Sequence, residues 1–102
     1  MYTSTRMTRF KTVAAMMAGV PTCVALVEHM KKEYGLDATL LSPAMGGHPA
    51  RVLFVTRGDD LQKMQDAQDR MTQDPKFREL VGKLGDLVDG SATNDQVWRT
   101  VV

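Results

Sequence analysis

The most regular hydrophobic pattern lies in the second half of the chain. Apolar residues there recur at i, i+3, i+4, i+7, i+10 and i+11, which is helical spacing; they are Phe77, Leu80, Val81, Leu84, Leu87 and Val88. Asp74-Pro75 predicts where this helix begins, because Asp caps a helix N-terminus and Pro suits the first helical position. Gly90-Ser91 predicts where it ends.

A second helical pattern precedes it. Leu61, Met64, Ala67 and Met71 follow helical spacing, and Gly58-Asp59-Asp60 offers an N-cap. The pattern breaks at 72–74. The sequence therefore predicts two consecutive helices, starting near Asp60 and at Pro75.

The first third of the chain changes pattern once. Residues 5–17 begin with rough alternation and predict a strand, which Ala18-Gly19-Val20-Pro21 would end. A helix is then predicted over about 21–34, with Gly35 as its left-handed cap. Its apolar stripe is expected to contain Val20, Val24, Val27, Met30 or Lys31, and Tyr34.

Three further segments predict strands. Leu36–Leu41 and Arg51–Thr56 are apolar, and the proline- and glycine-rich segment Ser42–Ala50 between them predicts a long loop. Residues 94–102 alternate well enough for a final strand. The order is strand, helix, strand, strand, broken helix, strand. It predicts one domain over 1–102 of ferredoxin-like α+β type (βαββαβ), with a four-stranded antiparallel sheet and the helices on one face.

The other face of such a sheet needs a cover. In each of the pairs Leu40/Leu41, Leu53/Phe54 and Val97/Trp98, one member should point away from the helices. Apolar residues make up 43% of the chain, so a monomer would expose a large apolar patch. We therefore expect a homodimer with the two sheets face to face.

Net charge and the one long uncharged stretch limit the classes of partner that the chain is expected to bind. Thirteen Lys and Arg against 12 Asp and Glu give a formal charge of +1, without the basic excess of nucleic-acid-binding proteins. The uncharged stretch Val13–Val27 follows basic residues as in a signal peptide, but Gly19 and Pro21 interrupt it and it is short for a membrane span. We expect a cytoplasmic protein that binds neither nucleic acid nor membrane.

The layout resembles a known superfamily. It is similar to the dimeric α/β-barrel proteins in four features: the element order, the Ala18–Pro21 segment before the first helix, the Asp-Pro-Lys-Phe sequence at Asp74–Phe77 within the second helical region, and the short final strand. Among these, the NIPSNAP-like and antibiotic-biosynthesis-monooxygenase-like small proteins are nearest. The resemblance implies a barrel-like homodimer with a pocket between sheet and helices. Members of that superfamily include cofactor-independent oxygenases, haem-degrading enzymes, polyketide cyclases and proteins of unknown role.

Two histidines and one cysteine are candidates for chemistry. His48, in the Gly46-Gly47 loop, has the residue type of a general base, although a solvated loop histidine is the simpler interpretation. His29, beside the apolar stripe, would face a pocket or a helix boundary. Cys23 is expected in the first turn of its helix, either as an activated thiol or, more simply, as a small buried hydrophobe.

Three aromatic residues are candidates for a ligand pocket. Tyr34, Phe54 and Trp98 could stack on a planar molecule, and the alternative for Trp98 is core or dimer interface. No zinc spacing, P-loop or dinucleotide motif is present, so neither a metal nor a cofactor is expected. The leading hypothesis is a homodimer that binds a small apolar molecule. The alternatives are a cofactor-independent monooxygenase- or cyclase-like enzyme and a non-catalytic structural dimer, and the sequence does not decide whether the protein is an enzyme.

Overall fold

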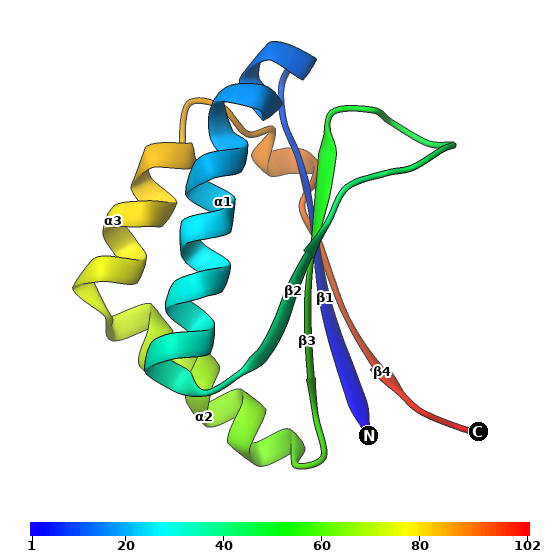
Figure 1. The fold of residues 1–102 in the computed structure, drawn as a ribbon, viewed down its shortest axis with the longest axis vertical. Coiled ribbons are helices and arrows are strands. Elements are labelled where there is room, and N and C mark those ends of the chain that lie inside the picture. The colour runs from blue at the N-terminus through cyan, green and yellow to red at the C-terminus, as the bar shows by residue number, and fades with distance from the viewer.

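The computed structural model describes all residues, 1–102, as one sheet with a layer of helices (Figure 1). The elements in chain order are β1 (Tyr2–Arg9), α1 (Val13–Tyr34), β2 (Asp37–Leu41), β3 (Arg51–Gly58), α2 (Leu61–Gln73), α3 (Pro75–Leu84), a short 3₁₀ helix (Gly90–Ala92) and β4 (Asn94–Arg99). The strands form one antiparallel sheet in the order β2-β3-β1-β4. This is the predicted ferredoxin-like arrangement.

All three helices lie on one side of the sheet, and the 42–50 loop projects from the other side (Figure 1). The main core forms between α1, α3 and the sheet end nearest that loop. It contains seven buried residues: Phe10, Cys23, Leu26, Ala50, Val52, Leu80 and Leu84. Phe10 is fully buried just after β1, and its N–H donates to the Ala50 carbonyl at 2.7 Å. The core therefore ties the start of α1 to the start of β3.

The predicted strand over residues 5–17 is wrong at both ends. β1 spans Tyr2–Arg9, and Thr12 then caps α1 by accepting a hydrogen bond from the Ala15 N–H at 3.0 Å. The segment Ala18–Pro21 consequently lies inside α1 rather than before it. Pro21 leaves the Met17 carbonyl without its usual helical donor. Met17 is 70% exposed, so water can reach this part of the helix.

The buried face of α1 also differs from the predicted stripe. Gly19, Cys23, Leu26, Val27 and Met30 are the buried residues of the helix, whereas Val24 is exposed. Gly19 allows the closest approach, because a Cβ there would lie 2.5 Å from Phe10 Cε1. A glycine that was expected to break structure instead lets the helix pack on Phe10.

The break between α2 and α3 is confirmed, but α3 ends earlier than predicted. Asp74 is the C-cap of α2 and the N-cap of α3, while α3 stops at Leu84. The expected continuation to Val88 is wrong because residues 87–89 form backbone hydrogen bonds with the end of β1 and with the residues that follow it. The Lys11 N–H donates to the Leu87 carbonyl at 2.9 Å, and the Asp89 N–H donates to the Arg9 carbonyl at 2.8 Å.

The face of the sheet away from the helices carries the predicted apolar residues. Leu40 and Phe54 are cross-strand partners that pack with the core, so alternation turns Leu41 and Leu53 to the open face. Trp98 is the partner of Thr3 and also lies on the open face, with 56% of its surface exposed. The prediction that one member of each pair points away from the helices is confirmed.

The helix α1 is long and apolar enough to cross a membrane when judged by length and composition alone, with a mean hydropathy of 1.5 over 18 residues. In this fold its apolar residues serve another purpose. Its buried face packs on the sheet and on α3, with Cys23 and Leu26 in the main core. The chain is a compact globular unit in which α1 is the central core helix.

Candidate functional site

A cavity of about 500 Å³ lies between the sheet and the helices. Its wall on the helix side is apolar and is formed by Leu26 and Met30 of α1, Leu61, Met64 and Met71 of α2, and Phe77, Val81 and Leu84 of α3. Gln65 and Gln68 of α2 are the polar residues on this side. The helices therefore offer a largely apolar surface to whatever occupies the cavity.

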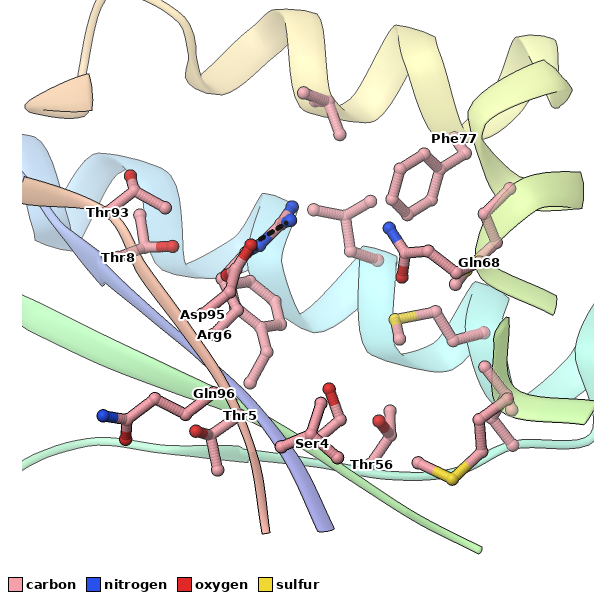
Figure 2. Close-up of a pocket in the computed structure, with 18 of the residues that line it drawn as sticks. Ser4, Thr5, Arg6, Thr8, Thr56, Gln68, Phe77, Thr93, Asp95 and Gln96 are labelled. Carbon is pink, nitrogen blue, oxygen red and sulfur yellow. Dashed lines mark hydrogen bonds and ion pairs between the residues drawn. The ribbon is translucent and has the colours of Figure 1, made fainter. Parts of the chain in front are cut away.

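The wall on the sheet side is more polar. Ser4, Arg6, Thr8, Phe54 and Thr56 line it from β1 and β3. Asp95 and Val97 of β4, together with Thr93 just before this strand, complete it. Figure 2 shows Arg6 and Asp95 standing on the strands below the helices, with Phe77 and Gln68 facing them from the helix side. A molecule here would meet carbon on one side and hydrogen-bonding groups on the other.

The most polar feature of the cavity is an ion pair between neighbouring strands. Arg6 donates from Nε to Asp95 Oδ1 and from Nη2 to Asp95 Oδ2, both at 2.7 Å. The two residues are cross-strand partners, so backbone register holds the fork-to-fork geometry. The hydrogen bonds from Arg6 lower the pKa of the Asp95 carboxyl, and the same bonds raise the pKa of Arg6. Both groups are therefore charged at neutral pH.

The cavity exists because the helix layer does not reach the edge of the sheet. All six residues of β4 are exposed, including Asp95 and Val97, which face the helix side. The Arg6 and Asp95 side chains are 48% and 55% exposed. The ion pair is thus open to solvent and to a ligand.

His29 belongs to a separate polar cluster with Tyr34 and Asp74. Asp74 Oδ2 lies 2.7 Å from His29 Nε2 and accepts a hydrogen bond from the Tyr34 hydroxyl, also at 2.7 Å. The contacts with His29 and then with Tyr34 lower the pKa of Asp74, and the bond to Asp74 raises the pKa of Tyr34. Arg70 stacks over the Tyr34 ring at 5.2 Å. The cluster joins α1 to the junction of α2 and α3.

The sequence-predicted pocket residues have separate positions. Phe54 lines the cavity, but Tyr34 and Trp98 do not. Tyr34 is held by Asp74 at the end of α1, and strand alternation puts Trp98 on the open face of the sheet. His29 also lies outside the cavity lining, although its neighbour Met30 belongs to it.

His48 and Cys23 have structural surroundings. The His48 Nδ1 atom accepts a hydrogen bond from the Ala50 N–H at 3.1 Å, in the loop on the other side of the sheet. Cys23 lies in the middle of α1 rather than in its first turn, so the positive end of the helix dipole is distant. Burial raises the pKa of its thiol to about 11, which fits a small buried hydrophobe.

Sequence reasoning missed Arg6 and Asp95. No motif or local periodicity singles out either residue. The signal that identifies them is strand order: once β1 and β4 are neighbours in the ferredoxin-like sheet, an arginine and an aspartate fall opposite each other. The alternation pattern alone does not supply the register that pairs them.

Comparison with protein-family models and with curated proteins finds no match to the chain. Solved structures do match. A NIPSNAP domain protein from Burkholderia xenovorans, described as uncharacterized, superposes with a TM-score of 0.81 at 13% identity over 99% of this chain and 95% of its own. A putative antibiotic biosynthesis monooxygenase from Nitrosomonas europaea has a TM-score of 0.76 at 13% identity over 100% of both chains.

A third similar structure is SnoaB of Streptomyces nogalater, a cofactor-independent oxygenase. Its TM-score is 0.70 at 12% identity, over 99% of this chain and 93% of its own. The expected resemblance to NIPSNAP and antibiotic-biosynthesis-monooxygenase-like proteins is confirmed at the level of the fold. At these identities the likeness concerns the backbone arrangement alone.

Proposed function

We propose that this protein binds a small, mostly apolar molecule in the cavity between its sheet and its helices. The observation that carries the proposal is the cavity itself: about 500 Å³, lined by 23 residues of which 12 are hydrophobic. Pockets of this size and lining are typical of sites for small molecules. A chain of 102 residues needs most of its apolar side chains for its core, so an apolar surface that lines a solvent-accessible cavity is best explained by ligand binding.

A neutral environment-sensitive dye, Nile red, tests the proposal with a matched pair of variants. Val81 lines the cavity from α3 and is 45% exposed, whereas Val24 lies outside it on α1 and is 46% exposed. We expect the fluorescence of the dye to increase with the wild type and with Val24→Trp. Val81→Trp should weaken dye binding by about tenfold or more, because the indole occupies part of the cavity. Equal binding by both variants would contradict the proposal.

We further propose that the protein is a cytoplasmic homodimer, with the open sheet faces of two copies together. The support is the apolar surface formed there by Leu41, Leu53 and Trp98, which a second copy would cover. Light scattering at micromolar concentration should give twice the mass of the chain, and Leu53→Glu should give a monomer. A wild-type monomer at that concentration would refute this part.

A second candidate function is a cofactor-independent monooxygenase- or cyclase-like activity. The observation that favours it is the fold shared with SnoaB, a cofactor-independent oxygenase. Without a cofactor the substrate itself must supply the electrons for reaction with oxygen. Incubation with an enolisable aryl ketone such as 2-tetralone under ¹⁸O₂, followed by mass spectrometry, tests it. Label in the product with wild type but not with Val81→Trp would support catalysis in the cavity.

The third possibility is a structural dimer without a ligand. It predicts the same mass by light scattering but no dye binding and no product. The dye experiment therefore separates it from the first proposal, and the labelling experiment separates binding from catalysis.

A further inference from the structure

The Arg6–Asp95 pair keeps unused hydrogen-bonding capacity inside the cavity. The guanidinium uses Nε and Nη2 for its two bonds to Asp95, so both N–H groups of Nη1 remain free. Each Asp95 oxygen likewise retains a lone pair. Because the pair lines the cavity and its side chains are about half exposed, a ligand can reach these groups.

The charge of this pair determines which polar group it can accept. Arg6 and Asp95 neutralise each other, so the local site has no net charge to attract an anion. A carboxylate approaching Arg6 would also approach the Asp95 carboxylate, and like charges this close repel. To bind Arg6 through both oxygens it would have to displace Asp95 and leave that carboxylate unpaired. A neutral oxygen can accept from Nη1 without disturbing the pair.

The surroundings add hydrogen-bonding groups but no second cation. Ser4, Thr8 and Thr56 present neutral hydroxyls from the sheet, and Gln65 and Gln68 present neutral amides from α2. Arg6 and Asp95 are the charged residues of the lining. Because Arg6 is paired with Asp95, the lining contains no unpaired positive group that could bind an anion.

We propose that Arg6 and Asp95 form the polar subsite of the cavity and select neutral ligands, in which an apolar body carries a carbonyl-type acceptor oxygen, over carboxylates of the same shape. This inference rests on the proposed small-molecule function and names its ligand class. Asp95 is the specificity-determining residue, because it makes Arg6 a hydrogen-bond donor without a free positive charge. Arg6 is the residue that contacts the ligand.

Two ligands that differ in the polar end test the proposal. 2-Acetylnaphthalene is a neutral ketone, and 2-naphthoate carries a carboxylate on the same ring system. Their affinities are measured at pH 7 and low salt by isothermal titration calorimetry. We expect the wild type to prefer the ketone by about tenfold, since the carboxylate meets Asp95.

Removing the acid should reverse this preference. Asp95→Asn retains the shape of the side chain but leaves Arg6 with an uncompensated positive charge, so naphthoate should gain about tenfold while the ketone changes little. Asp66→Asn is the matched control, because it makes the same change of net charge on α2 outside the cavity lining. It should leave both affinities as they are. Circular dichroism verifies that the variants are folded.

The outcomes separate the two proposals. Binding of both ligands with a ratio that Asp95→Asn does not alter overturns the subsite but leaves the cavity as a binding site. A wild-type preference for naphthoate also overturns the subsite. If neither these ligands nor Nile red binds the wild type, the proposed small-molecule function fails, and the subsite fails with it.

Discussion

On the helix-facing side of the sheet, the β2–β3 edge and the β4 edge differ in how well the helices cover them. On β3 and β2, Val52 and Ala38 are 2% and 6% exposed beneath the helix layer. On β4, at the other edge, every residue is exposed although Asp95 and Val97 face the same way. The same fold thus contains a close-packed half and an open half. We therefore expect stability to be concentrated in the close-packed half, whereas the open half leaves space for a ligand.

Local interactions explain why the cover ends where it does. Gly19 lets α1 approach Phe10 closely, which draws the long helix onto one end of the sheet. Beyond Leu84 the helix ends, and the chain forms backbone hydrogen bonds with residues 9–11, at the end of β1 and just after it. The helices therefore end before they cover β4. The cavity at this edge is therefore a consequence of how the helices pack on the rest of the sheet.

The largest loss of stability is expected at the most deeply buried residue of the close-packed half. Phe10 is fully buried among α1, α3 and β3, so Phe10→Ala should lower the free energy of unfolding by about 3–5 kcal/mol through lost burial and the cavity left behind. Urea denaturation followed by circular dichroism measures it. A loss below about 1 kcal/mol would show that this half is not the centre of stability.

A matched pair of valines compares the two halves directly. Val52 is 2% exposed in β3 and Val97 is 58% exposed in β4, and both side chains lie on the helix side of the sheet. We expect Val52→Ala to cost about 2 kcal/mol and Val97→Ala less than about 0.5 kcal/mol. Similar losses, measured by the same denaturation experiment, would mean that the cavity edge is packed in solution.

Most of the fold could be predicted from the sequence because its elements carry strong local signals. Helical spacing and the Asp74-Pro75 cap located α2 and α3. Alternation predicted that one member of each of the pairs Leu40/Leu41, Leu53/Phe54 and Val97/Trp98 faces away from the helices, and the strand register then identifies which member it is. The start of α1 was missed because Thr12, a residue type that caps helices, is also β-prone and lies in a stretch that reads as a strand. Gly19 and Pro21 looked like breakers, but a long helix with a core face tolerates both.

The candidate site was much less accessible to prediction than the fold. Of the expected pocket aromatics, Phe54 alone lines the cavity. The cavity depends on where the helix layer stops relative to β4, and that is decided by backbone bonds between residues 87–89 and residues 9–11. The Arg6–Asp95 pair depends on register between strands 89 residues apart in sequence. Neither property is visible in local periodicity.

The junction between α1 and the α2–α3 corner should respond to acid. The pKa of Asp74 is lowered in the folded protein, chiefly by His29 and then by Tyr34, so its stabilisation is present above the unfolded value of about 3.9 and is lost as pH falls below it. Asp74→Asn should lower Tm at pH 7 by about 4–8 °C. The difference from wild type should narrow as pH falls from about 5 to about 2. A difference independent of pH would contradict the assignment to the charge.

The smallest stability effect is expected at the ion pair of the open half. The Arg6 and Asp95 side chains are 48% and 55% exposed, and solvent-exposed pairs contribute little even with good geometry. A double-mutant cycle with Arg6→Met and Asp95→Asn should give a coupling free energy of unfolding of about 0–1 kcal/mol, reduced further in about 1 M salt. A coupling above about 2 kcal/mol would show that the pair mainly holds β4 to β1. A small coupling, combined with a large change in ligand preference, would assign these two charges to recognition, in contrast to the uncharged core of the close-packed half.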